Sequence, residues 1–225
     1  MQRTSPATPL ATRAEIVLNR LRDRYPAPRS ALSWASPWEL LVSTVLAAQC
    51  TDARVNQVTP EFFRRWPTIP SLAQARVEEV EEVIRSTGFF RNKAKNLIAT
   101  ARRLTQEYRA EVPETMEALL TLPGVARKTA NIVLSNAFGR HEGIAVDTHV
   151  RRLAFRLGLT SSKDPKRIEL DLMPLFPDQA WGEINHLLVW HGRDVCQARS
   201  PKCLSCPLDD ICPRCGVAEN EKRPQ

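Results

Sequence analysis

The chain has 225 residues, of which 43% are hydrophobic, so it is long enough for one large globular domain or two modest ones. Its 32 Lys and Arg against 25 Asp and Glu give a formal charge of +7, which favours a polyanionic partner without identifying it. We expect no signal peptide and no membrane contact, because no apolar stretch of membrane-spanning length is apparent, and we therefore expect a reducing, cytoplasmic location.

The first segment, residues 1–12, is rich in Ser, Thr and Pro without periodicity, which predicts a mobile arm. A helix from Ala14 to Arg24 follows.

Helix starts are marked by capping residues followed by proline. Ser36 can cap the next helix, whose first position suits Pro37. The same start signal recurs at Thr59-Pro60 and Asp164-Pro165.

Glycines that follow apolar-periodic stretches mark the expected helix ends, because glycine readily takes the left-handed conformation that terminates a helix. No alternating pattern with hairpin turns is found, so the sequence predicts an all-α fold of about ten short helices. The basic excess ends near Arg140, where we expect a domain boundary. The expected helix ends are Gly88, Gly139, Gly158 and Gly192.

The segment from Leu122 to Ala130 reads as a helix, a tight loop and a second helix. Gly124 supports the turn, and the amides at the start of the second helix can hold a phosphate without reading base sequence. A plain helical hairpin is the alternative, but it does not explain why two basic residues, Arg127 and Lys128, come directly after the turn.

Two further polar clusters are weak signals by themselves. Asp147 is placed to cap the helix that follows it, and His149 suits a solvated or core position as well as a functional one. The segment from Gln49 to Asp52 suits a simple turn between helices.

Four cysteines near the end of the chain follow a C-x6-C-x2-C-x5-C pattern: Cys196, Cys203, Cys206 and Cys212. Thiolate ligands at this uneven spacing favour an iron–sulfur cluster. A tetrahedral zinc site is the alternative, although structural zinc sites usually use two C-x(2–4)-C pairs. Cys50 and Cys215 lie outside the set.

The order Gln49-x-Thr51-Asp52, LPGV-x-RKTAN, VDTH and four cysteines resembles the endonuclease III family of helix-hairpin-helix DNA glycosylases, from about residue 13 to 214. The resemblance implies a six-helix barrel domain over residues 30–140. It also implies that residues 13–29 and 141–225 fold together as a domain carrying a [4Fe-4S] cluster on the four cysteines.

The resemblance further implies a bifunctional DNA glycosylase and abasic-site lyase of base excision repair. Lys128 is then the nucleophile that forms a Schiff base, and Asp147 is the partner carboxylate that accepts a proton. The implied partner is double-stranded DNA with damaged pyrimidines or abasic sites, bound by a monomer associated with the nucleoid.

DNA contacts are implied for two groups of residues. Gln49 resembles a polar plug that fills the gap left by the flipped base, and Phe89 resembles an apolar wedge, with an ordinary core position as its alternative. The remaining expected contacts are Thr51, Asp52, Gly124, Ala126, Arg127, His149, Arg151, Arg199 and Lys202.

This chain departs from the family pattern at Ala126, where a second glycine is usual, and at Phe89, where leucine is expected. Two other functions stay open: a mismatch-specific glycosylase, and a non-catalytic iron–sulfur DNA-binding module. Lys128 argues against the first, and the pairing of Lys128 with Asp147 argues against the second.

Overall fold

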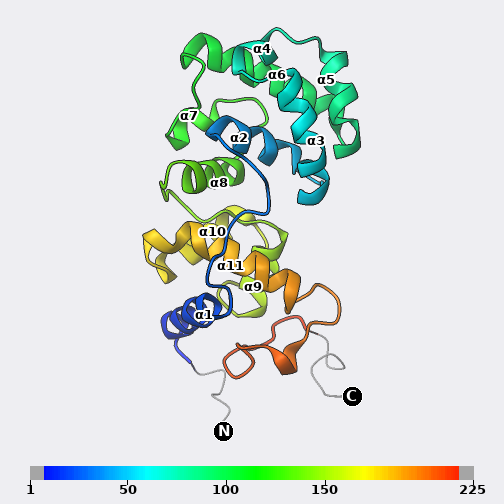
Figure 1. The fold of residues 1–225 in the computed structure, drawn as a ribbon. Helices are drawn as coiled ribbons and strands as arrows, with labels where there is room; N and C mark the ends of the chain where they lie inside the picture. The colour runs from blue at the N-terminus through cyan, green and yellow to red at the C-terminus, as the bar shows by residue number, and fades with distance from the viewer. Residues whose placement is uncertain (1–7, 218–225) are drawn as a thin grey trace. The chain divides into compact units, whose positions relative to one another are not determined.

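The computed structural model describes residues 8–217, which form eleven α-helices, four 3-10 helices and no β-strand (Figure 1). The predicted all-α class is therefore confirmed. The chain divides into two compact units: a central unit of residues 30–140, and a terminal unit made of the chain up to Arg29 together with the chain from His141 onward. No helix among the described residues is long and apolar enough to cross a membrane.

The central unit is a bundle of short helices around one apolar core. Its longest helix, α6, buries the predicted face, including Ala94, Leu97 and Leu104, against α4 and α5. α2 starts as predicted, because Ser36 accepts a hydrogen bond from the amide of Glu39. The unit contains α2 (Pro37–Leu46), α3 (Asp52–Arg65), α4 (Ile69–Ala73), α5 (Val77–Ile84), η1 (Arg85–Thr87), α6 (Phe90–Glu107), α7 (Met116–Leu120) and α8 (Arg127–Ala137).

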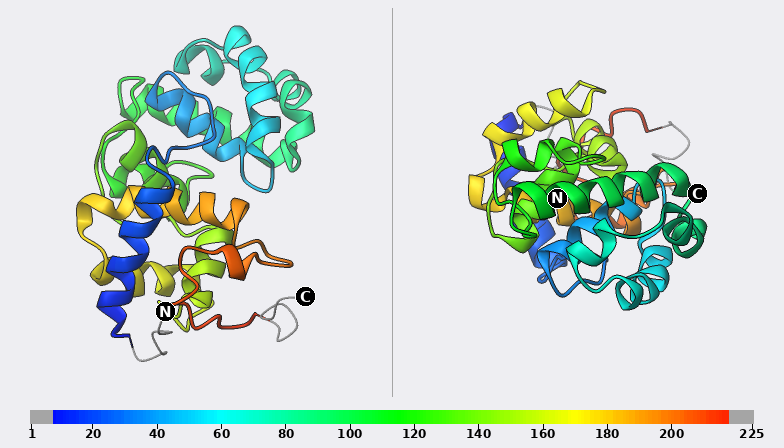
Figure 2. Two further views of the ribbon diagram at one scale, coloured as in Figure 1. Left: turned by 60° about the horizontal axis from the view of Figure 1, so that its bottom comes forward. Right: turned by 90° about the horizontal axis from the view of Figure 1, so that it is seen from above.

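The terminal unit joins segments that lie far apart in the sequence. α1 and α11 are in contact, and Figures 1 and 2 both show them as neighbours. Ion pairs from α1 reach distant residues: Arg22 to Glu183 and Arg20 to Asp210. The unit contains α1 (Leu10–Arg24), α9 (Thr148–Arg156), α10 (Pro165–Leu172), η2 (Met173–Leu175), η3 (Asp178–Ala180), α11 (Trp181–Asp194) and η4 (Cys203–Ser205).

Three expected boundaries are wrong. α1 begins at Leu10, so the last part of the expected mobile arm is helical; residues 1–7 lie outside the described residues. Thr59-Pro60 does not start a helix, because Thr51 already caps α3 and Pro60 lies within it. Gly192 does not end α11 but packs tightly inside it: a Cβ there would stand 2.8 Å from His149 Nδ1.

Candidate active site

The hairpin between α7 and α8 needs a glycine at its turn. Gly124 has a φ of 78°, in the left-handed region that other residues avoid. A Cβ at this position would also stand 2.8 Å from Asn96 Nδ2 and 3.0 Å from Asn96 Cβ. Gly124 therefore has two independent structural reasons to be glycine, and it holds the hairpin tightly against α6.

The N-terminus of α8 lacks a side-chain cap. Ala126 occupies the capping position and offers no hydrogen-bond acceptor to the first-turn amides. Its φ of −97° suits any residue, so the backbone does not require the second glycine usual in the family. An uncapped helix start is a ready anion site, because its amides and its dipole both favour negative charge. Side-chain caps are present on α2, α3, α4, α7, α9 and α10.

Lys128 lies in this uncapped first turn of α8, directly after Arg127. Its side chain is exposed, whereas Ala130 and Val133 of the same helix are buried in the central unit. The helix thus fixes the lysine backbone through its buried face and leaves the amine accessible to a reactant.

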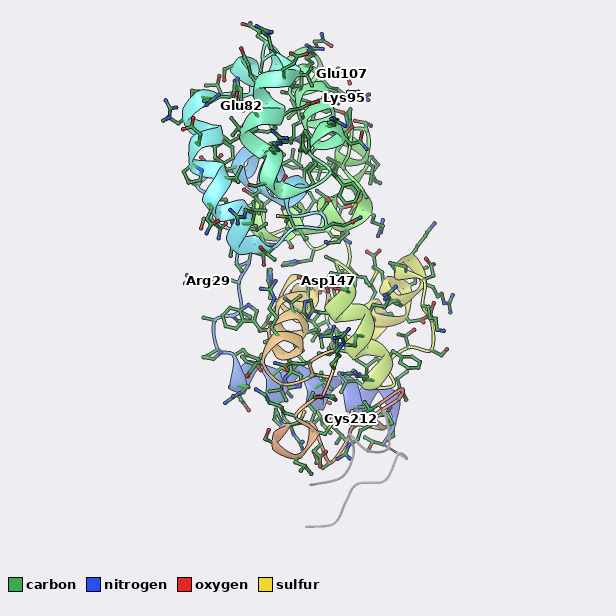
Figure 3. All side chains as sticks on the ribbon, turned by 90° about the vertical axis from the view of Figure 1, so that its right-hand side faces the viewer. Arg29, Glu82, Lys95, Glu107, Asp147 and Cys212 are labelled. Atoms are coloured by element: carbon green, nitrogen blue, oxygen red, sulfur yellow. The ribbon has the colours of Figure 1, made fainter. Side chains whose placement is uncertain are left out.

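Asp147 caps α9 in the terminal unit (Figure 3). Its Oδ1 accepts a 2.8 Å hydrogen bond from the amide of Val150, so the capping role expected from the sequence is confirmed. A carboxylate has two oxygens, and capping uses one of them. The half-buried Asp147 is therefore held in place while its second oxygen can take another role.

His149 and Arg152 tie α9 to α11. Arg152 Nη2 lies 3.1 Å from His149 Nδ1 and donates to the carbonyl of Gly192 at 2.9 Å, while its Nε donates to the carbonyl of Cys196. Burial lowers the pKa of Arg152. Arg151, in contrast, is exposed and lines a surface pocket with Lys163. Of the two predicted contacts on α9, Arg151 is thus the one on the surface.

The segment between α2 and α3 places Gln49 on the surface. Gln49 is exposed with a φ of 55°, and Thr51 caps α3 by accepting from the amide of Arg54 at 3.3 Å. Asp52 is the first residue of α3, where a carboxylate favours the helix dipole. Thr51 and Asp52 thus have structural roles in this turn.

Phe89 is 63% exposed, so its alternative assignment to the core is wrong. It precedes α6 with a φ of 49°, again in the left-handed region. Its neighbour Phe90 packs partly against the central core under the guanidinium of Arg91, 5.4 Å from the ring centroid. The chain therefore buries one of two adjacent phenylalanines and presents the other to solvent.

The four spaced cysteines line one cavity in the terminal unit; Cys212, in the C-terminal segment, is labelled in Figure 3. Several hydrogen-bond donors point at the sulfurs. The amides of Leu208 and Arg214 donate to Cys206 and Cys212 at 3.4 Å. Arg156 Nη1 lies 3.5 Å from the sulfur of Cys196. Such donors stabilise thiolate ligands, so the donor chemistry fits a cluster.

Burial is the largest cause that raises the pKa of Cys206 to about 12 and that of Cys212 to about 11; the other thiols of the set contribute. Four thiolates here therefore require a positive centre among them. Within residues 8–217, no three His, Cys, Asp or Glu side chains are arranged to coordinate a metal ion. The fit thus rests on the shared cavity and on the donors to sulfur.

The loop between the first two of these cysteines is held by Arg156. Its Nη1 donates to the carbonyl of Gln197 at 2.6 Å and its Nη2 to that of Ala198 at 3.0 Å. Arg199 and Lys202 of this loop are exposed. The sequence interpretation did not single out Arg152 or Arg156, although their i, i+4 spacing on one helix face was a visible signal.

Cys215 and Cys50 are placed differently from the four. Cys215 is not among the described residues lining the cavity, and its amide donates to the carbonyl of Arg156. Cys50 packs against the core of the central unit. The candidate residues fall into both units: Gln49, Thr51, Asp52, Phe89, Gly124, Ala126, Arg127 and Lys128 lie in the central unit, and the rest lie in the terminal unit.

Comparisons with known proteins agree on one family. Residues 42–178 match the family described as HhH-GPD superfamily base excision DNA repair protein. Endonuclease III of Synechocystis sp. is 53% identical over 201 residues, covering 89% of this chain and 92% of the relative.

Solved structures agree with this. A trapped covalent intermediate of endonuclease III with DNA matches with a TM-score of 0.87 and 40% identity, covering 91% of this chain and 96% of that one. A thermostable thymine-DNA glycosylase has a TM-score of 0.81 at 22% identity, covering 90% of this chain and 96% of that one, and shares the fold alone. The chain belongs to the endonuclease III family within the HhH-GPD superfamily of base excision DNA repair proteins.

Proposed function

We propose that this protein is a bifunctional DNA glycosylase and abasic-site lyase of base excision repair that acts on damaged pyrimidines in duplex DNA. One observation carries the proposal: an exposed lysine, Lys128, stands in the uncapped first turn of α8 directly after the hairpin turn. The related enzyme's trapped covalent intermediate with DNA supports a covalent mechanism of this kind.

In the proposed chemistry, the amine of Lys128 attacks the anomeric carbon of the flipped nucleotide, and the bond from that carbon to the base breaks. The departing base takes up a proton from water. The bond from the anomeric carbon to the ring oxygen then breaks, the ring oxygen takes up the proton that the amine has lost, and the lysine stays linked to the opened sugar as a Schiff base. Loss of a proton from the neighbouring sugar carbon then expels the 3′ phosphate by β-elimination. Asp147 accepts the proton that the amine must lose, a role that its capping bond permits because a second oxygen remains.

The four cysteines Cys196, Cys203, Cys206 and Cys212 would hold a [4Fe-4S] cluster, in line with their common cavity and sulfur-directed donors. The cluster would supply structure, because it would close the loop that carries Arg199 and Lys202. We assign the central unit to the six-helix barrel domain and the terminal unit to the cluster domain.

DNA binding in this proposal begins at the phosphates. The α8 amides and Arg127 hold one phosphate region, and the exposed cations Arg151, Arg199 and Lys202 hold others, without reading base sequence. Gln49 and Phe89 enter the duplex where the damaged base leaves it. Their exposure supports this role. We place the reaction in the cytoplasm, at the nucleoid, with the protein as a monomer.

The test is a panel of single-site duplexes carrying thymine glycol, a thymine·guanine mismatch, a preformed abasic site or no lesion. We expect base release and strand cleavage by β-elimination with thymine glycol, and cleavage at the abasic site. Base release at the mismatch alone, without cleavage, would instead identify a mismatch-specific glycosylase. Binding without any reaction would identify a non-catalytic module.

A further inference from the structure

Lys93 is a lysine that the proposed chemistry does not use, and it is buried. It lies in the first turn of α6 with 5% of its surface exposed. Its ammonium donates hydrogen bonds of 2.8 Å to the carbonyls of Leu46 and Thr87. Burial lowers the pKa of Lys93, with the thiol of Cys50 acting in the opposite direction. An ionisable group is seldom buried without a specific role for its bonds.

Both acceptor carbonyls end helical elements. Leu46 is the last residue of α2, and Thr87 is the last residue of η1. Carbonyls at a helix C-terminus lack partners within the helix and favour a positive charge. Lys93 thus joins two chain segments that are distant in sequence through charge-assisted bonds.

Each of these segments leads directly to one exposed residue. Gln49 follows Leu46 by three residues, and Phe89 follows Thr87 by two. Both have left-handed backbones, with φ of 55° and 49°, although neither is glycine. Such conformations persist only where the surrounding structure holds them, and they gather at functional sites.

We infer that Lys93 is a positioning residue that fixes the Gln49 and Phe89 loops as one rigid element, set to enter the duplex together when a base pair opens. This inference rests on the proposed function, in which both residues insert into DNA. Lys93 itself touches no substrate: its buried ammonium acts through the two carbonyls.

The test compares Lys93→Met with Lys95→Met, because Lys95 is an exposed lysine on the same helix (Figure 3). Each variant and the wild type receive two duplexes that differ at one position: thymine glycol, whose base pair must open, and a preformed abasic site, which has no base pair to open. We expect Lys93→Met to slow excision of thymine glycol by roughly tenfold to a hundredfold and abasic cleavage far less. Lys95→Met should match the wild type on both.

Equal losses of activity on both duplexes would show that Lys93 serves folding alone, which would overturn the inference. Unchanged activity of Lys93→Met on both duplexes would also overturn it. The abasic duplex reports how much folded enzyme is present, so partial unfolding of Lys93→Met cannot imitate the expected pattern. Wild-type protein that cleaves neither duplex would contradict the proposed function as well, whereas an active wild type with equal losses contradicts the role of Lys93 alone.

A double-mutant cycle with Phe89→Ala gives an independent readout. If Lys93 acts through the position of Phe89, Lys93→Met should cost clearly less on thymine glycol once Phe89 has been truncated. Losses that simply multiply would mean that the two side chains act separately, which would overturn the inference.

Discussion

At the level of a single residue, the solvent exposure of Phe89 allows its proposed wedge role to be tested separately from a packing role. Because its ring is 63% exposed, Phe89→Ala should change the free energy of unfolding by less than about 0.5 kcal/mol and still lower excision of a paired lesion. The matched control is Phe62→Ala at a fully buried ring, which should cost about 3–5 kcal/mol. Thermal melting and excision rates decide, and a drop in melting temperature like that of Phe62→Ala would contradict the wedge role.

Cys215 allows a test of which thiols would hold the proposed metal centre. Its neighbour Cys212 lines the common cavity and receives a donor at sulfur, whereas Cys215 engages Arg156 through its backbone amide. Cys215→Ser should therefore leave the iron content of the purified protein unchanged, and Cys212→Ser should lower it. Iron and sulfide analysis measures both; loss of iron in Cys215→Ser would overturn the ligand assignment.

At the level of an element, α8 lacks the side-chain N-cap that six of the other α-helices have. If its first-turn amides bind phosphate, then Ala126→Asp should stabilise the helix by about 1 kcal/mol and weaken DNA binding by about tenfold, since the new carboxylate occupies and repels the same site. Ala126→Asn is the matched control: it caps without charge and should stabilise similarly with a smaller loss of affinity. Unchanged affinity in Ala126→Asp would place the phosphate elsewhere.

At the level of the whole molecule, local signals predicted well where one residue decides the outcome. Ser36 and Asp164 cap helices as expected, and Gly88, Gly139 and Gly158 take positive φ after helical elements. The sequence interpretation failed at two positions. Gly192 lies inside α11, where side chains of α9 leave no room for a Cβ, and Thr59-Pro60 falls within α3 because an earlier cap starts that helix.

In the candidate site too, local patterns were predicted and distant contacts were not. Lys128, Asp147 and the four spaced cysteines were recognised as sequence motifs, and Gly124 was predicted from the chemistry of the turn. Arg156 and Lys93 were not singled out. The i, i+4 spacing of Arg152 and Arg156 indicates a shared helix face, but no local pattern encodes the distant backbone carbonyls that Arg156 and Lys93 bind. Residues whose partners are distant in sequence are therefore harder to predict than residues that belong to a local motif.

Borohydride trapping with Lys128→Gln tests the central claim most directly. The substitution keeps a polar side chain of similar length but removes the amine, so no Schiff base can form, while the α8 amides and Arg127 remain to bind DNA. We predict that wild type and Lys95→Gln become covalently linked to a duplex with an abasic site on reduction, and that Lys128→Gln binds this duplex without becoming linked to it. Trapping of Lys128→Gln at the wild-type level would show that another amine is the nucleophile and would contradict the mechanism.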